Sequence, residues 1–399
     1  MNCISIGKPA INEYIALQEF PKQGDIFSIK KKYESLGGVS ATAACILGKW
    51  GVNSYYTGIT GNDQYAEKVR NILQENKVNT KFMEVEFTKD TATNFIILDS
   101  KTGVSTKMLV NDPSFELTKY RYDFTPDYAV LDGTDVSGTL ALLNSGMAVK
   151  TFFYGRVGNH DSIQFTKRCN YNIVTELFAE QMTKENVDGS AEGYVNLYQK
   201  IVDVGGSSNY IVILNNRKIL YSVNGQVKLL PEIKINVADD SSFDGVFVGA
   251  FAFATIKGLE LDDAIKFANT AAGLSLSRIG AVSAIPELND IFANTDVKDK
   301  FKDTDYVETE ENKAAREFSE STPMGINVNQ QQVTTPVEQH VEPQVDAFAS
   351  TPVNTQNVVN EVQTPVEQPT YTQEVSTPVE QPMEQQPSVE TNFFDNLNV

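Results

Sequence analysis

The sequence predicts an α/β fold with three layers, in which helices cover both faces of a mainly parallel central sheet. Two observations predict this class. Short β-branched runs alternate with amphipathic helical stretches over about the first 300 residues. A chain of that length also buries enough apolar surface to fold around a large interior without disulfides or metal ions.

The predicted strands and helices follow one another in this alternating order. Strands are expected where β-branched and aromatic residues gather, at residues 3–6, 54–57, 128–131, 150–154, 172–174 and 210–214. Helices are expected where apolar residues recur with helical spacing, at residues 41–49, 64–75, 246–256 and 261–276. Two more extended segments, at about 14–33 and 94–109, interrupt the alternation.

Residues 236–251, NVADDSSFDGVFVGAF, combine the features of an anion-binding corner. A β-branched run at residues 233–237 predicts a strand. The apolar helix that follows is preceded by four good N-cap residues, Asp239, Asp240, Ser241 and Ser242. Because the first N–H groups of a helix lack partners, a strand, a turn and a helix N-terminus in this order favour a bound anion.

This stretch resembles the second signature of the ribokinase-like (PfkB) sugar kinases, which reads roughly D-T-T-G-A-G-D-A-F-V-G-G-F. In that family the last Asp is the catalytic base and the glycines hold phosphate. Aligned without gaps, the first Asp of the signature is Asp239, but the base position falls on Gly245. Asp244 stands one residue before that position.

Other stretches agree with the same family in order along the chain. Residues 37–51, GGVSATAACILGKWG, resemble its first signature, with Thr42 in place of the signature Asn. Three further stretches match a P-x-x-G-[DE] turn, a G-x-x-G-x-D turn and the adenine-side helix with its final turn, at residues 21–25, 58–63 and 261–286. The resemblance therefore covers most of residues 1–292.

The resemblance implies a ribokinase-like domain over residues 1–300, with a small β lid formed by segments at about 12–36 and 92–110. It implies MgATP as the cofactor and a homodimer formed through the lid. It also assigns site residues. The implied substrate-binding residues are Asn12, Gly37, Gly38 and Thr42, and the implied nucleotide and anion-loop residues are Asp239, Ser241, Ser242, Asn215, Asn269 and Gly273.

Two interpretations of Asp244 stay open. A one-residue shift could bring its carboxylate to the base position, yet on a helix that step turns a side chain by about 100°. Otherwise Asp244 is an acidic residue that the helix dipole favours in the first turn. Ser242, Phe243 and Asp244 also replace the G-A-G segment of the anion loop, where a bulky ring and a negative charge would oppose phosphate binding.

The metal and nucleotide motifs are also altered. The N-x-x-E motif of the family falls on Thr175 and Phe178, so the resemblance supplies no metal ligand here. Glu176 or Glu180 could substitute, or both could be surface glutamates. The T-x-G-x-x-G nucleotide turn loses both glycines, the first of them at Asn215.

Beyond an acidic linker at residues 301–321, residues 322–399 are rich in Pro, Gln, Thr, Val and Glu and repeat TPVEQ. Such a tail cannot bury enough apolar surface to order itself, so we expect it to be disordered. Its last residues, 391–399, place Phe393, Phe394 and Leu397 at helical spacing. They predict a peptide that docks on a protein partner, although a fortuitous apolar end stays possible.

Charge and cysteine usage limit the partners and the compartment. The formal net charge is −19, and no Lys or Arg follows Arg316, which argues against nucleic acid or anionic membrane as partners. The cysteines, Cys3, Cys45 and Cys169, lie in apolar runs and are interpreted as reduced core residues. We find no leader peptide or membrane span and expect a cytoplasmic protein.

Together these losses predict a pseudokinase. The base, the anion-loop glycines, the metal motif and the nucleotide turn are all changed, whereas the structural positions of the family remain. We therefore expect a binding or scaffold module, without a required cofactor, whose tail carries a partner peptide. The alternative is a divergent MgATP-dependent sugar or nucleoside kinase that uses Asp244 as its base.

Overall fold

The computed structural model describes residues 1–301, except for residues 19, 27, 30–31, 112, 116–121, 148 and 207–208. The predicted acidic linker beyond Phe301 and the predicted tail, residues 322–399, lie outside the described residues. The TPVEQ repeats and the terminal peptide with Phe393, Phe394 and Leu397 therefore remain predictions from the sequence.

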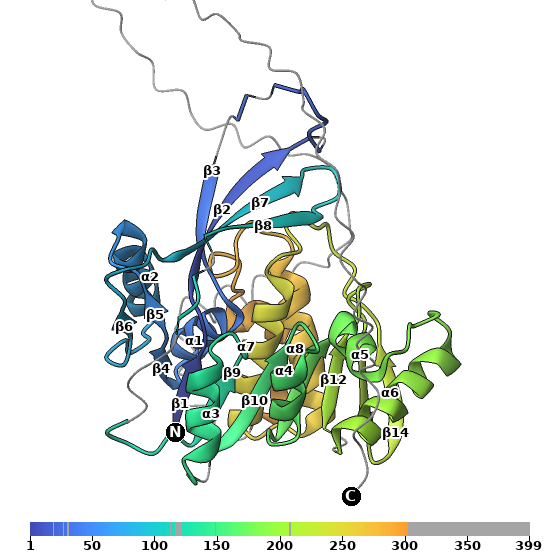
Figure 1. Cartoon of the computed structure of the whole chain (residues 1–399). Helices are drawn as coiled ribbons and strands as arrows, with labels where there is room; N and C mark the ends of the chain where they lie inside the picture. Colours follow the sequence, from blue (N-terminus) through green and yellow to red (C-terminus); the bar gives the residue numbers. More distant parts are fainter. Residues whose placement is uncertain are drawn as a thin grey trace, which may run out of the picture. The chain divides into compact units, whose positions relative to one another are not determined.

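A central sheet forms the middle layer of the folded unit (Figure 1). Its strands are β1 (Asn2–Ile6), β4 (Asn53–Thr57), β9 (Tyr128–Leu131), β10 (Lys150–Gly155), β11 (Tyr171–Thr175), β12 (Tyr210–Ile213), β13 (Ile219–Val223) and β14 (Gln226–Leu230). Their order is β14-β13-β12-β11-β10-β9-β1-β4. All neighbours from β12 to β4 are parallel, and β13 and β14 add an antiparallel edge. The parallel strands are those predicted from the sequence, within one residue at each end.

Helices cover both faces of this sheet, as the α/β fold class requires. One core lies between the sheet and α1 (Val39–Lys49), α7 (Phe243–Ile256) and α8 (Leu261–Ser275). The other core lies between the sheet and α3 (Val136–Asn144), α4 (His160–Thr166), α5 (Glu176–Thr183) and α6 (Ala191–Gly205). Successive residues of β10 alternate between the two, since Phe152 and Tyr154 enter the first core and Phe153 enters the second. The predicted three-layer architecture is confirmed.

Helix α7 is the central helix of the first core. Every residue from Gly245 to Ile256 is buried, and a helix that is apolar on all sides belongs inside a fold. It packs between α1 and α8. Gly249 permits the close contact with α1, because a Cβ atom at this position would lie 2.9 Å from the Cα atom of Ala43. The N-terminus of α7 is thereby fixed at one end of the sheet.

A separate four-stranded sheet, the lid sheet, projects beyond one end of the central sheet (Figure 1). Its strands are β2 (Ala10–Leu17), β3 (Lys32–Gly37), β7 (Ala92–Asp99) and β8 (Ser105–Asn111), in the order β3-β2-β7-β8. Tyr14, Ile96 and Leu98 form its small buried cluster. The remaining described elements are helix α2 (Gln64–Glu75), the strand pair β5 (Ile59–Thr60) and β6 (Glu84–Val85), helix α9 (Leu288–Ala293) and the 3-10 helix η1 (Lys298–Lys300).

Several predicted elements differ from the structure, among them the extended segment at 94–109, which is interrupted between β7 and β8. Residues 233–237 form no strand, because their backbone does not continue the sheet and the next two N–H groups, of Ala238 and Asp239, donate to Leu276 instead. Helix α7 begins at Phe243, three residues before the predicted start. The extended segment predicted at 14–33 is interrupted, since β2 ends at Leu17 and β3 begins at Lys32.

The predicted state of the cysteines is confirmed: Cys3, Cys45 and Cys169 are free and buried. Among the helices of the described residues, none has both the length and the apolar composition to span a bilayer.

Candidate active site

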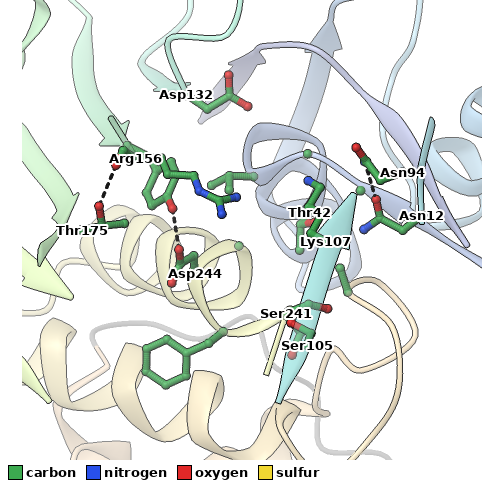
Figure 2. A pocket seen from close by; sticks show the side chains of 18 of the residues that line it. Asn12, Thr42, Asn94, Ser105, Lys107, Asp132, Arg156, Thr175, Ser241 and Asp244 are labelled. Atoms are coloured by element: carbon green, nitrogen blue, oxygen red, sulfur yellow. Dashed lines mark hydrogen bonds between the residues drawn. The ribbon is translucent and has the colours of Figure 1, made fainter. Parts of the chain in front are cut away.

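A pocket of about 650 Å³, here called the lid pocket, lies between the lid sheet and the end of the central sheet (Figure 2). Residues that follow the carboxyl ends of the parallel strands line one side: Asp132 after β9, Arg156 after β10 and Asn215 after β12. Asn94 and Lys107 of the lid sheet line the other side. In open α/β sheets this strand edge is the usual place for a ligand.

Polar groups on the lid side are held in fixed orientations. The Asn94 Nδ2 group donates to Asn12 Oδ1 at 2.8 Å (Figure 2), and Asn12 Nδ2 donates to Tyr14 Oη at 3.3 Å. Gly37 is needed beside them, because a Cβ atom there would lie 2.4 Å from Asn12 Oδ1. Thr42 lies buried on α1 and also lines the pocket.

The predicted substrate-binding residues therefore meet in one place. Gly38, which precedes α1, adopts φ +96°, and a Cβ atom there would lie 2.8 Å from the Lys8 carbonyl oxygen. The amide groups of Asn12 and Asn94 and the hydroxyl of Thr42 offer both donors and acceptors. Such a set suits a ligand with several hydroxyl groups.

The loop before α7 is held by its own acidic side chains. The Asp239 carboxylate accepts the N–H groups of Ser241 at 2.8 Å and Gly280 at 2.9 Å, and burial raises the pKa of this carboxyl above its ordinary value. Ser242 is the N-cap residue, but its side chain does not cap the helix. Its hydroxyl instead lies 3.0 Å from that of Ser275. Ser241 and Ser242 line the pocket, whereas Asp239 lies behind it.

Asp244 and Gly245 point to different sides at the start of α7. A Cβ atom on Gly245 would lie 3.0 Å from the side chain of Thr42, so the base position of the family signature faces this predicted substrate-binding residue without a carboxylate. The Asp244 carboxylate instead accepts a hydrogen bond of 2.5 Å from the Tyr154 hydroxyl (Figure 2). Burial raises the pKa of Asp244, against the opposing effects of this hydrogen bond and of the Arg156 charge.

The Phe243 ring packs into the core at the start of α7. It is buried in the core and stacks on Phe247, with ring centroids 6.3 Å apart. The side chain at this position therefore turns inward, because α7 begins here and one of its faces is covered by the core. Phe243 still borders the lid pocket, so the expected effect of its bulk on a bound anion stays a prediction.

The predicted nucleotide residues are separated by the structure. Asn215 lines the lid pocket and binds Glu176, whose carboxylate accepts the Asn215 backbone N–H at 2.9 Å and its Nδ2 group at 3.0 Å. Asn269 and Gly273 lie outside the pocket lining. Asn269 Nδ2 donates to the Pro231 carbonyl at 3.1 Å, and a Cβ atom on Gly273 would lie 2.5 Å from Ile233 Cβ. Residues 231–233 thus cover this face of α8.

Sequence reasoning did not single out the cationic residues of the pocket. Its cationic side chains are Lys8, Lys107, Arg156 and Arg217, which come from four separate segments of the chain. Asp132 was also missed. Their position in the sequence could have identified Asp132 and Arg156, because both come just after predicted parallel strands. The carboxyl ends of such strands gather at one edge of a sheet, where ligands bind.

A comparison with known protein families shows which family the chain belongs to. The pfkB family carbohydrate kinase profile matches residues 3–152 and 160–288. This chain belongs to the pfkB family. The ribokinase of Bacillus subtilis is 21% identical over 305 residues, which cover 73% of this chain and 98% of that relative.

Solved structures of the pfkB fold agree. Arabidopsis thaliana ribokinase complexed with ribose and ATP has a TM-score of 0.59 and 18% identity, covering 73% of this chain and 97% of that one. Cryptococcus neoformans ribokinase in complex with ADP has a TM-score of 0.61 and 20% identity, covering 74% and 99%. At these identities the likeness shows the fold.

Some of the residues that the family signature implies for MgATP differ in this pfkB-family chain, since Thr175 and Phe178 stand at the metal motif. Within the described residues, no three His, Cys, Asp or Glu side chains gather as a metal site. Asp132, which borders the pocket, already accepts hydrogen bonds from the hydroxyl groups of Ser40 at 2.6 Å and Thr134 at 2.5 Å. The face of α8 that carries Asn269 is covered.

Proposed function

We propose that this pfkB-family chain binds a sugar-like ligand in the lid pocket without phosphorylating it, and acts as a binding module. The observation that carries the proposal is that Gly245 and Asp244 point to different sides at the start of α7. The position that faces Thr42 has no side chain to accept a proton from a substrate hydroxyl. The neighbouring carboxylate is held by Tyr154 on the other side of the helix N-terminus.

The binding side of the pocket supports the same proposal. The hydrogen bond between Asn94 and Asn12 is intact, and Gly37 leaves the space that Asn12 requires. These residues are on the rigid lid strands β2, β3 and β7, which keeps their polar groups in place before a ligand arrives. A pocket that offers several hydrogen-bonding groups but no carboxylate at the position facing Thr42 is suited to binding alone.

A turnover experiment tests the proposal. The full chain is incubated with MgATP and either ribose or fructose, and ADP release is followed with a coupled assay. We expect no ADP above the protein-free control, together with a ligand-dependent rise in Tm in the same samples. ADP release that is lost in Asp244→Asn and retained in Asp161→Asn, an exposed carboxylate on α4, would overturn the proposal.

That outcome would establish the alternative, a divergent ATP-dependent sugar or nucleoside kinase. One observation favours it: Asp244 still lines the lid pocket, and burial raises its pKa toward the range of a general base. In this alternative, Asp244 releases Tyr154 and takes a proton from a substrate hydroxyl.

The proposed scaffold role also includes the C-terminal tail. Its support comes from the sequence, in which Phe393, Phe394 and Leu397 form an apolar group at the end of a long polar segment. Full-length chain and a variant lacking residues 391–399 are used as baits, with a Phe393→Ser, Phe394→Ser variant beside them. Identical sets of bound proteins for all three would remove the docking role.

We also propose a homodimer formed through the lid sheet. Strand β8 is an edge of this sheet, and Met108 and Val110 on it are 44% and 56% exposed. An exposed apolar edge strand is a surface that proteins normally cover. A second copy of the chain that pairs its own lid with this one would cover it.

A further inference from the structure

Helix α2 packs against β2 at the base of the lid sheet (Figure 1). The helix is itself anchored in the domain, because Val69 and Leu73 are fully buried in the first core. These two residues are four positions apart and therefore lie on one face of the helix. A bond from α2 to the lid thus ties the lid sheet to the body of the domain.

The N-cap residue of α2, Asp63, bonds the helix to the residue that precedes β7. Its Oδ1 atom accepts the Ala66 N–H at 2.9 Å, which caps the helix, and the Thr91 hydroxyl at 2.7 Å. Its Oδ2 atom accepts the Thr91 N–H at 2.8 Å. Gly61 permits this approach, because a Cβ atom there would lie 2.5 Å from the Thr91 nitrogen. One carboxylate therefore fixes both the start of α2 and the entry into the lid.

Two further side chains of α2 hold the lid strands. The Tyr65 hydroxyl donates to Glu13 Oε1 on β2 at 2.6 Å, and the Lys68 ammonium group pairs with the Glu34 carboxylate on β3. Tyr65 and Lys68 are three positions apart, so they lie on the same helix face. Glu13 and Glu34 are directly opposite in the register of β2 and β3. Two neighbouring lid strands are therefore held at the same level.

The Glu13 carboxylate is buried and fully paired. It is 7% exposed, and its Oε2 atom lies 2.7 Å from the Lys32 ammonium nitrogen. Burial alone would raise the pKa of Glu13, but the hydrogen bonds from Lys32 and Tyr65 outweigh burial and lower it. Because a buried charge is costly without its partners, this carboxylate keeps Tyr65 and Lys32 in place.

The held carboxylates lie on the face of the lid sheet opposite to the lid pocket. Successive side chains of a strand point to opposite faces. Asn12 comes directly before Glu13 and lines the pocket, as does its register partner Asn94, whereas Glu13 and Glu34 do not. A bond that holds Glu13 from outside therefore fixes the direction of the Asn12 amide inside.

We propose that α2 holds the lid sheet in one position before a ligand binds. The contacts of Asp63, Tyr65 and Lys68 with the lid are here called the α2 brace. Glu13 is a positioning residue in this brace, and it acts through Asn12, which it keeps directed into the lid pocket. A pocket formed in advance loses less conformational freedom on binding. This inference rests on the proposed function, because it explains how the pocket keeps its recognition groups in place without a ligand.

A distance measurement between two spin labels on the full chain tests the α2 brace. The labels are attached at Thr106→Cys on β8 and Asp161→Cys on α4, both exposed positions, and they join the lid to the body of the domain. The native cysteines are buried and stay unlabelled. We expect one narrow distance distribution without added ligand. A broad distribution, or one with two components, would overturn the proposal.

The variants change α2 and leave the sequence of the lid strands intact. Tyr65→Phe combined with Lys68→Met should widen the distance distribution about twofold or more, and amide hydrogens of β2 and β3 should exchange about tenfold faster or more. Lys68→Arg keeps the ion pair with Glu34 and should leave both measurements as in the parent chain. An unchanged lid in the double variant would contradict the proposal.

A matched control is Tyr221→Phe. It removes an equivalent hydrogen bond, which the Tyr221 hydroxyl donates to Asp262 at 2.9 Å, but in the central sheet. We expect the lid distances of this variant to equal those of the parent chain. Equal widening in the control and in the double variant would mean that the effect does not come from the α2 brace. The Tm of each variant shows whether a wider distribution reflects a lost fold.

Ligand binding gives a second measurement of the positioning role. A sugar, ribose or fructose, that raises the Tm of the parent chain should bind the double variant about fivefold or more weakly in calorimetry. Equal affinity would remove Glu13 as a positioning residue. The two proposals fail separately. A parent chain that binds neither sugar, or that releases ADP from MgATP, would end the proposed function, while the spin-label distances still decide whether α2 holds the lid.

Discussion

Asp240 accepts two hydrogen bonds from Ser105, one from its backbone N–H at 2.9 Å and one from its hydroxyl at 2.5 Å. Asp240 lies in the loop that leads into α7, and Ser105 is the first residue of β8. The Asp240 N–H also donates to the Gly103 carbonyl at 3.0 Å. The loop at the start of α7 and the lid sheet are therefore bonded directly to each other, on one side of the lid pocket.

Breaking this contact should loosen the lid. Ser105→Ala removes the hydroxyl hydrogen bond to a carboxylate, which contributes about 1.5–3 kcal/mol. We expect amide hydrogens of β8 to exchange about tenfold faster or more, with little change in β1. Thr106→Ala, on the next residue of the same strand, is the control. Unchanged exchange in Ser105→Ala would show that the lid is held elsewhere.

The contact between Ile233 and Gly273 can be tested through stability. Gly273→Ala places a methyl group about 2.5 Å from Ile233 Cβ, and we expect a loss of about 1–3 kcal/mol in urea unfolding. Ile233→Gly removes the Cβ and both Cγ atoms that cause the conflict, so the double variant should be more stable than the sum of the two changes predicts. Additive effects would mean that residues 231–233 do not cover α8 in solution.

Asp262 predicts a pH dependence of stability. Burial alone would raise its pKa, but hydrogen bonds from Lys228, Lys266 and Tyr221 outweigh burial and lower the pKa from 3.8 to about 2. Because the folded-state pKa is depressed, the stabilisation is complete above the unfolded-state pKa near 4. It is lost as the pH falls from about 4 toward 2.

Asp262→Asn should therefore cost about 2 kcal/mol at pH 7, measured by urea unfolding, and should flatten the acid limb of the stability curve. Asp290→Asn is the matched control, because Asp290 lies in the first turn of α9. Since Asp290 forms no ion pair within the described residues, we expect a change below about 0.5 kcal/mol there. An equal loss of unfolding free energy in both variants would mean that the helix dipole, and not the ion pairs of Asp262, causes the destabilisation.

The proposed dimer makes a further prediction. Val110→Lys introduces a charge at the exposed apolar edge of the lid sheet, where Val110 is 56% exposed. We expect light scattering after size exclusion to show a shift from dimer to monomer, with a dimer Kd weakened about tenfold or more. Phe87→Lys is the control, since Phe87 is 76% exposed outside the lid strands. A monomeric parent chain would contradict the dimer itself.

The parallel strands and most helices could be predicted because their signals are local. Strand β9, for instance, was predicted over the residues it occupies, and α2 likewise. The failures have a common cause. Residues 233–237 have the composition of a strand, yet they pair with no strand of the described residues. The chain there lies against α8, and the next N–H groups donate to Leu276 just after that helix. β propensity describes fit to a sheet, and it cannot supply the partner.

The sequence by itself determined the fold class, the burial of the cysteines and the presence of glycine at the family's base position, Gly245. Each depends on residue type, spacing or alignment. Only the tertiary structure decided that Asp244 turns to Tyr154, that Glu176 binds Asn215 and that Arg156 enters the lid pocket. Asp244 and Tyr154 are 90 positions apart in the sequence, and Glu176 and Asn215 are 39 positions apart. Folding of the sheet brings such residues together at one edge, and no local pattern records which pairs will meet.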